Sequence, residues 1–550
     1  MAKGPLAAAL FGAAFFVWVH GPSVIDPSNV DWLMRSDWRF QFLGWQFFRQ
    51  EPWSWPPGLI NGYNRAPHGS AIGLTDSIPL VAFALKPLSA ALPMPFQYLG
   101  AWLMLCFALQ GYFGALLVRV RSPSAMHQVA GGILFVLLPT LLNRTVHAAL
   151  CAQWLILWAI WLYVRHRPRH DVPFGQLVGI GVIAGLVHPY LAIMVLALEG
   201  ALVARVWLED GWRSAARAAD GAALALVGVG AGWWASGLFS LPASALAREG
   251  LTTFSMNLLG PVSPNQWSAL LPEQRIGAGG QGFEGFQYMG AGVLALIVVG
   301  LAVAAWRTPS GGWRPAMPLL AVSLALAAYA LSPRVTFADR ILVEYSTPWL
   351  ERASVFRVTG RFFWPAAYSL LALALGVVVS RLRPRPASAI LCAAVVLQAI
   401  DLTPGLSSRR AVAHGPASHR WSYPFTSPEW GAILAHYRHL ALVLPPQCGT
   451  TPVSFEAAGH LASLHGLSVN TGEQSRWDDQ ATSDYCAEFR QRLTEGRFDD
   501  DTLYLLNPTY LENVRKGDEL ACGELDGVVW CATARSHAPW RARAPRSSRP

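Results

Sequence analysis

Long apolar stretches recur along the first 400 residues of this chain, with short polar loops between them. A helix needs roughly 20 apolar residues to cross the hydrocarbon core of a bilayer, and a shorter stretch can borrow flanking residues. The pattern therefore predicts a mainly α membrane bundle of about 11 spans. The predicted spans are residues 6–20, 96–118, 129–142, 148–164, 174–187, 190–207, 222–241, 288–306, 316–331, 362–379 and 387–400.

The short loops of this bundle indicate its direction, because cytoplasmic loops carry an excess of Lys and Arg. All the basic loops become cytoplasmic if Lys3 is cytoplasmic and residues 79–92 do not cross. That segment contains Pro79, Lys86 and Pro87, which favours a re-entrant or half-buried helix. The alternative is that it crosses and another weak span does not. The basic loops lie at residues 119–121, 165–169, 205–217, 307–314 and 381–385.

The composition supports an integral membrane protein with several spans. The chain is 53% hydrophobic and 14% charged, whereas soluble proteins contain about 25% charged residues. The net charge of +9 comes almost entirely from Arg in the short loops. We interpret this charge as membrane topology and expect no nucleic-acid partner.

The composition changes after about residue 402, where the apolar spans stop. We expect a membrane domain over residues 1–402, a soluble α/β domain over residues 403–535 and a disordered tail over residues 536–550. The predicted topology puts the soluble domain on the periplasmic side. Residues 440–444 and 502–506 have the pattern of short strands.

Four cysteines of the soluble domain predict disulfides in an oxidising compartment. Residues 522–531 read CGELDGVVWC, which predicts a hairpin with a type I′ turn at Asp526-Gly527. This register makes a bridge from Cys522 to Cys531 reasonable and leaves Cys448 for Cys486. Four cysteines allow three connectivities, so the pairing is a hypothesis.

The first outer loop, residues 21–75, is polar and aromatic, and includes Trp45 and Arg49. An ionised carboxylate at the membrane face is costly unless it is paired, binds a metal or does chemistry. Asp37 could be a general base, or it could pair with Arg in an interfacial helix. Asp76 could belong to the same site or cap the next helix. Asp37 and Asp76 together could hold a divalent cation, Mg or Mn.

Polar residues at two breaks between spans are further candidates for substrate binding. Arg144 and His147 follow a span, and they suit a phosphate and a titrating group or simply form a polar turn. His188 interrupts a long apolar region beside Pro189, where it could line a cavity or serve as a structural residue.

The second large outer loop, residues 242–287, and the outer region 333–361 add four candidates. Glu284 lies in GGQGFEGFQYMG, which also contains Tyr288 and has a composition suited to sugar binding or to a flexible loop. Arg357 and Arg361 are four residues apart, so on a helix they share one face that suits a diphosphate.

Several motifs together resemble a family of uncharacterised bacterial membrane proteins placed near the GT-C glycosyltransferases. They are SDWRFQFLGWQFFRQEPW, LTDSIPL, FQYLGAW, GGQGFEGFQYMG and FRVTGRFFWPAAY, and the resemblance covers about residues 32–400. The resemblance implies a GT-C-like fold, a polyprenyl-phosphate-linked sugar donor and an acidic base in the first outer loop. Asp37 matches that base by position, with Asp31 as its nearest competitor, and Arg357 and Arg361 would suit the lipid phosphate.

The expected function is therefore that of an inverting membrane glycosyltransferase. It would transfer a sugar from a polyprenyl-phosphate-linked donor to a periplasmic glycan or lipid acceptor. Asp37 would deprotonate the acceptor, with Asp76 orienting it, while arginines including Arg144 neutralise the leaving phosphate. The alternatives are a transporter or flippase of a lipid-linked glycan and a non-catalytic envelope assembly protein.

Overall fold

The computed structural model describes residues 3–242, 245, 250–277, 280–306, 314–346, 354–415, 421–510 and 520–533. Contacts within the chain divide it into two compact units. Unit 1 consists of Met1–Asn29, Tyr98–Trp233 and Leu246–His419, and unit 2 of Val30–Gln97, Trp234–Ala245 and Arg420–Pro550. From Val30 onward, the first outer loop thus shares a unit with the C-terminal domain. The tail predicted over residues 536–550 lies outside the described residues.

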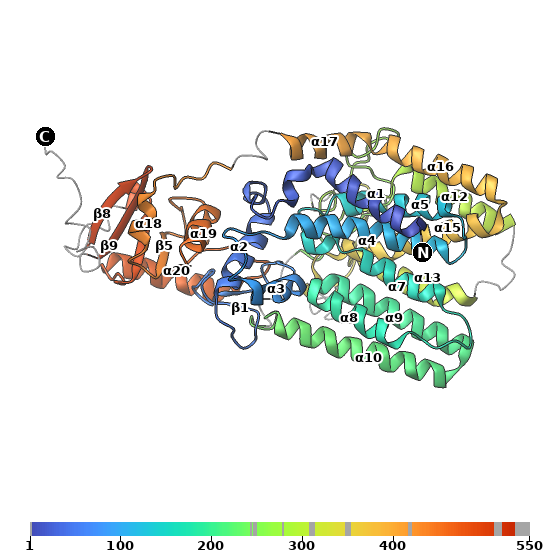
Figure 1. The fold of residues 1–550 in the computed structure, drawn as a ribbon, viewed down its shortest axis with the longest axis horizontal. Coiled ribbons are helices and arrows are strands. Elements are labelled where there is room, and N and C mark those ends of the chain that lie inside the picture. The colour runs from blue at the N-terminus through green and yellow to red at the C-terminus, as the bar shows by residue number, and fades with distance from the viewer. Residues whose placement is uncertain are drawn as a thin grey trace. The chain divides into compact units, whose positions relative to one another are not determined.

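Unit 1 is a bundle of helices, and each of the 11 predicted apolar segments overlaps one of them (Figure 1). The mainly α class of this part of the chain is therefore confirmed. The helices are α1 (Lys3–His20), α4 (Leu99–Arg119), α5 (Ala125–Val136), α7 (Trp154–Arg165), α8 (Phe174–Val187), α9 (Pro189–Asp210), α10 (Trp212–Ala235), α12 (Ala291–Trp306), α13 (Met317–Ala330), α15 (Trp364–Arg381) and α16 (Pro384–Asp401).

Six helical segments among the described residues are long and apolar enough to cross a membrane. A seventh span results if α16 and α17 (Thr403–His414), which meet at a bend of 54°, count as one. Helices α5, α8, α12 and α13 are apolar but shorter. The chain is thus a multi-pass membrane protein, and the count of 11 spans stays a prediction.

Small residues allow the helices of unit 1 to approach closely. A Cβ atom on Gly12 of α1 would lie 2.1 Å from the carbonyl oxygen of Phe107 on α4. On α4, a Cβ atom on Gly111 would lie 2.3 Å from the carbonyl oxygen of Ala8. Only glycine fits at such crossings, which are typical of helix pairs in membranes.

The predicted basic loops meet at one end of unit 1, which we call the basic end. Arg121 follows α4, Arg165 ends α7, Arg205 lies in the last turns of α9 and Arg381 ends α15, and all four line one cavity. Arg314, before α13, lies next to Pro315 of the same cavity. These loops therefore share a side, as predicted. Arg307 lies outside the described residues.

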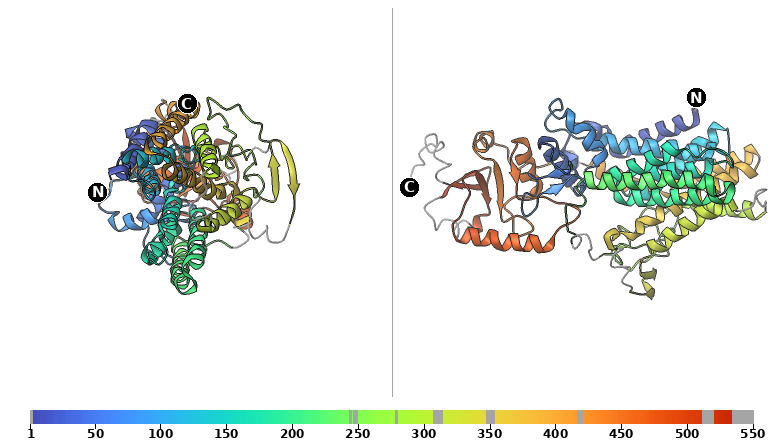
Figure 2. Two further views of the ribbon diagram at one scale, coloured as in Figure 1. Left: turned by 90° about the vertical axis from the view of Figure 1, so that its right-hand side faces the viewer. Right: turned by 90° about the horizontal axis from the view of Figure 1, so that it is seen from below.

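The opposite end of unit 1 carries irregular segments. They include α6 (Pro139–Leu142), η4 (Ala148–Cys151), η7 (Thr359–Phe363) and a hairpin of β3 (Arg334–Phe337) and β4 (Arg340–Glu344). The hairpin projects from the helices in the left view of Figure 2, and every residue of β4 is exposed.

In unit 2 the first outer loop forms α2 (Trp38–Gln50) and the pair β1 (Leu59–Ile60) and β2 (Ser70–Ala71). The segment after this loop forms α3 (Pro79–Leu85) followed by η3 (Lys86–Leu88). The two consecutive helices cover residues 79–88, which is about 15 Å at the α-helical rise. That is half of the roughly 30 Å hydrocarbon core. The length favours the predicted half-buried segment over a crossing helix.

The C-terminal part of unit 2 is an α/β domain, as predicted. Its sheet has the order β6-β5-β7-β9-β8, in which the first three strands are parallel and the last two antiparallel additions. Helices α18 (Glu429–Leu434), α19 (Phe455–Leu464) and α20 (Asp479–Thr494) accompany this sheet (Figure 1). The strands are β5 (His439–Val443), β6 (Ser468–Val469), β7 (Thr502–Leu506), β8 (Leu520–Leu525) and β9 (Val528–Thr533).

Strands β8 and β9 form the predicted hairpin in the predicted register. Leu525 pairs with Val528 and Cys522 with Cys531. Asp526 and Gly527 have φ of 52° and 76°, as a type I′ turn requires. Both predicted disulfides, Cys448–Cys486 and Cys522–Cys531, are confirmed.

Candidate functional site

Three side chains from distant segments of unit 1 surround the carboxylate of Glu284. Its Oε2 accepts hydrogen bonds from Arg144 Nη1 at 2.6 Å and from Arg361 Nη2 at 2.8 Å. Its Oε1 lies 3.1 Å from Nε2 of His147. Arg144 is 1% exposed, and Glu284 and Arg361 are each 6% exposed. Four predicted site residues therefore meet in one buried group, which we call the Glu284 cluster.

The local backbone explains how Glu284 reaches this position. Arg144 Nη2 donates to the carbonyl oxygens of Phe283 at 3.0 Å and Glu284 at 2.9 Å, which fixes the loop. A Cβ atom on Gly285 would lie 2.0 Å from the carbonyl oxygen of Ser255. The glycine-rich run thus lets two backbone segments pack against each other, and it holds Glu284 in place.

The charges of the cluster favour an ionised Glu284. Burial raises the pKa of this carboxyl, but Arg361, Arg144 and the hydrogen bond with His147 outweigh burial and hold the pKa well below 4.5. Burial lowers the pKa of Arg144 to about 10, with Glu284 opposing and Arg361 and Arg409 adding to the decrease. At neutral pH the carboxylate is charged, and its low pKa makes it too weak a base for general-base catalysis.

The cluster has more positive than negative charge. Arg409 of α17 hydrogen-bonds Oδ1 of Asn143, next to Arg144, and its guanidinium lies 5.6 Å from the ring centre of Trp267. With three arginines and one carboxylate, the group carries a net charge of about +2 when His147 is neutral. An excess of guanidinium groups suits an anion such as phosphate.

The break between helices α8 and α9 at His188 positions the aromatic residue Tyr190 beside the cluster. His188 Nδ1 accepts a hydrogen bond from the Tyr190 amide at 3.2 Å and thereby caps α9. The ring centre of Tyr190 lies 4.9 Å from the Arg361 guanidinium, and its hydroxyl accepts from the Val358 amide at 3.0 Å. Tyr190 was not among the predicted site residues, although its place after His188-Pro189 was a usable signal.

The expected single helix through Arg357 and Arg361 is wrong. Arg357 and Val358 lie between two 3₁₀ helices, η6 (Ser354–Phe356) and η7, and Val358 has a non-helical ψ of 71°. Gly360 allows this break, because a Cβ atom there would lie 2.9 Å from Cα of Gly285. Arg361 therefore faces Glu284, whereas the role of Arg357 stays a prediction.

Tyr288 has a structural partner in unit 1. Its hydroxyl donates to Oδ2 of Asp401 at 2.6 Å, and the same oxygen accepts from the Ala291 amide at 2.8 Å. Asp401 is fully buried and caps the first turn of α12. Sequence analysis did not select Asp401, which directly follows the last predicted span and ends α16. Substrate binding by Tyr288 stays a prediction.

In unit 2, both candidate carboxylates lie at or next to left-handed backbone in segments that meet near the start of α2. Asp37 is the N-cap residue and follows Ser36, which has a φ of 52°. Asp76 has a φ of 56°, and the neighbouring Ser77 Oγ donates to the carbonyl oxygen of Gln41 in the first turn of α2 at 2.6 Å. Left-handed backbone is costly for residues other than glycine and often marks functional segments.

The acidic surroundings of Asp37 include residues that the sequence did not indicate. Arg39 forms ion pairs with Glu456 at 3.6 Å and Glu473 at 3.2 Å. Burial raises the pKa of Glu473, Arg39 opposes this, and the negative charge of Asp37 raises it further. Glu473 therefore lies close enough to Asp37 to sense its charge, and it joins the candidates for acid–base chemistry.

Trp45 and Arg49 bind the backbone of the segment that follows α3. Trp45 Nε1 donates to the carbonyl oxygen of Phe96 at 3.0 Å. Arg49 donates to the carbonyl oxygens of Ser89, Leu92 and Pro93 at 2.8–3.0 Å. These contacts have a structural role, and substrate binding by either residue stays a prediction.

A divalent cation at Asp37 and Asp76 also stays a prediction. Across the described ranges, no group of three or more His, Cys, Asp or Glu side chains is arranged to hold a metal ion. Two carboxylates alone leave most of the coordination shell of Mg or Mn to water or substrate.

Comparison with known proteins gives a family and distant structural likenesses. Residues 9–403 match "Domain of unknown function (DUF6311)", and residues 429–533 match "DUF6311 C-terminal domain". No curated protein matches the sequence. Among solved structures, the chain is similar to an Archaeoglobus fulgidus oligosaccharyltransferase tethered with an acceptor peptide containing the NVT sequon. The identity is 11%, the match covers 91% of this chain and 68% of that chain, and the TM-score is 0.42. At this TM-score the likeness carries no conclusion about the site.

Proposed function

The chain belongs to the DUF6311 family, whose description states no activity, and we propose from its own residues that it is a membrane glycosyltransferase. It would transfer a sugar from a polyprenyl-phosphate-linked donor to a periplasmic glycan or lipid acceptor in the bacterial inner membrane. The observation that carries the proposal is the Glu284 cluster, a buried and positively charged group at the end of unit 1 opposite the basic end.

The position of the cluster suits the phosphate of a lipid-linked donor. Arg361 precedes α15 and Arg381 ends it, so the 18 residues of this helix separate the cluster from the basic end by about 27 Å. That distance is close to the roughly 30 Å hydrocarbon thickness, which would place the cluster near the far membrane surface. The headgroup of a polyprenyl phosphate lies at such a surface.

The arginines of the cluster would stabilise the leaving phosphate. In an inverting transfer, the acceptor oxygen forms a bond to the anomeric carbon while the bond from that carbon to the phosphate oxygen breaks. Negative charge then develops on the phosphate, and Arg144 and Arg361 are preorganised to neutralise it because Glu284 fixes their guanidinium groups. Arg357 is proposed as a further phosphate ligand.

Asp37 is the proposed general base, because the low pKa of Glu284 makes that carboxylate too weak a base. Asp37 would accept the proton from the acceptor hydroxyl as the hydroxyl attacks. Asp76 would orient the acceptor, because its segment packs on the first turn of the helix that Asp37 caps. No step is assigned to a cation.

The test is a transfer assay with the full chain in proteoliposomes and defined, radiolabelled polyprenyl-phosphate sugars. We expect product with the wild type, no product with Asp37→Asn, and product with Asp31→Asn, which removes the neighbouring carboxylate. Thermal unfolding of each variant shows that the fold is kept. Equal turnover by Asp37→Asn and the wild type would reject Asp37 as the base.

The same assay separates the alternatives. Movement of the donor across the bilayer without product would indicate a transporter or flippase. Neither product nor movement with any donor would favour an envelope assembly protein. Either result contradicts the proposed enzyme.

A further inference from the structure

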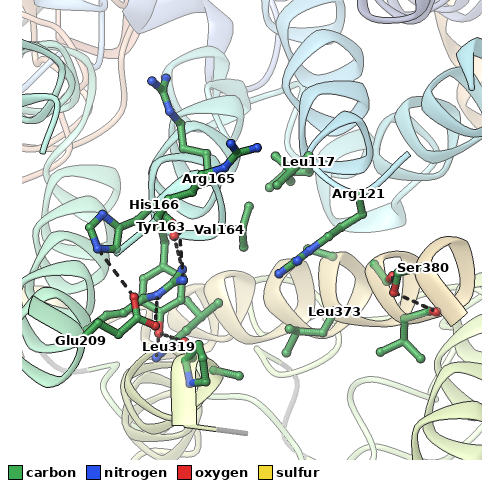
Figure 3. Close-up of a pocket in the computed structure, with 18 of the residues that line it drawn as sticks. Leu117, Arg121, Tyr163, Val164, Arg165, His166, Glu209, Leu319, Leu373 and Ser380 are labelled. Carbon is green, nitrogen blue, oxygen red and sulfur yellow. Dashed lines mark hydrogen bonds and ion pairs between the residues drawn. The ribbon is translucent and has the colours of Figure 1, made fainter. Parts of the chain in front are cut away.

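A second arginine-rich site lies at the basic end of unit 1, far from the Glu284 cluster. It is a cavity of about 550 Å³ between the ends of α4, α7, α9, α12, α13 and α15 (Figure 3). The charged side chains that line it are Arg121, Arg165, Arg167, Arg205, Arg381 and Glu209. With His166 neutral, the described lining has a net charge of about +4.

The carboxylate of this lining is already paired. Glu209 Oε1 lies 3.1 Å from Arg205 Nε, one turn earlier on α9. Arg205 also donates to the carbonyl oxygens of Tyr163 at 2.5 Å and His166 at 3.2 Å, so it holds the end of α7 in place. The charges of Arg205 and Glu209 therefore compensate each other, and the excess positive charge comes from the other arginines.

Arg121 presents part of that excess to the cavity. Figure 3 shows its side chain extending from the end of α4 into the open space above Leu373. Within the described part of the chain, no carboxylate lies within 4.0 Å of its guanidinium. Burial lowers the pKa of Arg121, and the like charges of Arg205 and Arg381 lower it further. An anion bound here would relieve this repulsion.

The remaining wall of the cavity is apolar and consists of side chains from the surrounding helices. Leu117, Leu319 and Leu373 line it. Gly376 of α15 leaves room there, because a Cβ atom on it would meet only Cγ of Arg121 within 4 Å, at 3.9 Å. The cavity thus offers positive charge and apolar surface side by side.

Exposed tryptophans mark the depth of this cavity in the membrane. Trp207, Trp212 and Trp306 lie at the same ends of α9, α10 and α12, and they are 61%, 68% and 91% exposed. Tryptophan is enriched at the level of the lipid headgroups. A basic pocket between helices at this level fits the phosphate of an anionic lipid.

We propose that this cavity binds the phosphate headgroup of an anionic phospholipid, with Arg121 and Arg381 on the phosphate and the lipid chain along the leucine wall. A soluble phosphate compound has the same charge as this headgroup but lacks a hydrocarbon chain that could pack on the apolar wall. The proposed site is independent of the glycosyltransferase site, since it lies at the opposite ends of the same helices.

The test is native mass spectrometry of the purified full chain, titrated with dioleoylphosphatidylglycerol, dioleoylphosphatidylcholine, glycerol 3-phosphate or inorganic phosphate. We expect the wild type to bind the anionic lipid at least about tenfold more tightly than the zwitterionic one. Arg121→Gln removes the charge, and Gly376→Leu fills the cavity without changing any charge. Each should weaken binding of the anionic lipid about tenfold.

Arg385→Gln is the matched control, because Arg385, in the first turn of α16, is exposed and does not line the cavity. It should bind the lipid like the wild type. Arg121→Gln should unfold at the same temperature as the wild type or higher, since it removes a repelled charge, and Leu favours the helix more than Gly at position 376. Unchanged lipid binding by both variants would overturn the proposal. Equal competition by glycerol 3-phosphate would reassign the site to a soluble phosphate compound.

Discussion

Arg144 and Glu284 are 140 residues apart in the sequence, yet Nη1 of the arginine lies 2.6 Å from Oε2 of the glutamate in the interior of unit 1. Arg361 binds the same oxygen at 2.8 Å, so one carboxylate pairs with two buried guanidinium groups. Removing one partner of a buried ion pair leaves an uncompensated charge, which costs about 3–5 kcal/mol. The stability of unit 1 should therefore depend on Glu284.

Glu284→Gln should lower the free energy of unfolding by about 3–5 kcal/mol, because the amide keeps the shape but not the charge. The measurement is thermal or chemical unfolding of the purified full chain. The matched control is Glu344→Gln, which breaks the pair of Arg334 and Glu344 at 2.6 Å with side chains 40% and 50% exposed. An exposed pair contributes less than about 1 kcal/mol. Equal effects of the two variants would contradict a buried, energetically important cluster.

His460 should make unit 2 sensitive to acid. It is buried against the rings of Phe42, Trp421 and Tyr423, at ring-centre distances of 5.5–6.1 Å. Burial lowers its pKa from 6.5 to about 4. The unfolded chain then binds a proton between these pH values while the folded chain does not, so stability falls as the pH decreases from about 6.5 to about 4.

His460→Phe should remove this decrease, which is on the order of 3 kcal/mol for a difference of about 2.5 pH units. The measurement is the unfolding temperature of the full chain across that pH range. His170→Phe, at an exposed position, is the control and should keep the acid sensitivity of the wild type. If the His460 variant loses stability in acid as steeply as the wild type, another group is responsible.

The two disulfides should differ in their contribution to the C-terminal domain. Cys448–Cys486 closes a separation of 38 residues, whereas Cys522–Cys531 closes 9 across a hairpin that its turn already aligns. Loop-closure entropy gives about 4 kcal/mol for the longer loop and about 2.5 kcal/mol for the shorter one.

Replacing Cys448 and Cys486 by Ser should therefore destabilise the domain more than replacing Cys522 and Cys531 by Ser. Limited proteolysis of the full chain during denaturant titration would measure this, with the replacement of buried, unbridged Cys151 by Ser as a check for the loss of a thiol alone. A larger loss from the hairpin pair would mean that the chain-entropy argument does not decide the order.

Local patterns allowed much of this fold to be predicted. The helices of unit 1 follow from apolar stretches, and the hairpin and its bridge follow from Asp526-Gly527, which needs no distant partner. The pairing of the first outer loop with the C-terminal domain could not be predicted in this way. It depends on contacts such as the ion pair of Arg39 with Glu473. These two residues are 434 positions apart (473 − 39), and no local sequence pattern indicates such a contact.

The candidate site shows the same division. Arg144, His147, Glu284 and Arg361 could be selected by residue type and predicted side, but their meeting at one carboxylate depends on how the loops fold back. The helix expected around Arg361 failed because of the close approach of two glycines, a tertiary contact. Tyr190, Asp401 and Glu473 were missed because their partners lie in other segments.

Asp76 offers a way to separate backbone from chemistry. Its φ of 56° is tolerated by Asn and Asp through local hydrogen bonding, but it costs an alanine about 1–2 kcal/mol. Asp76→Asn therefore keeps the turn and removes the charge, while Asp76→Ala removes both.

If Asp76 orients the acceptor, both variants should lose sugar transfer by about tenfold or more, and Asp76→Ala alone should also unfold at a lower temperature. If Asp76 serves only the turn, Asp76→Asn should transfer like the wild type. Transfer rates and unfolding temperatures of the two variants, measured on the same preparations, distinguish these outcomes. Because both changes occur at one position, the comparison of Asp76→Asn with the wild type reports the carboxylate, and the difference between the two variants reports the left-handed backbone that carries it.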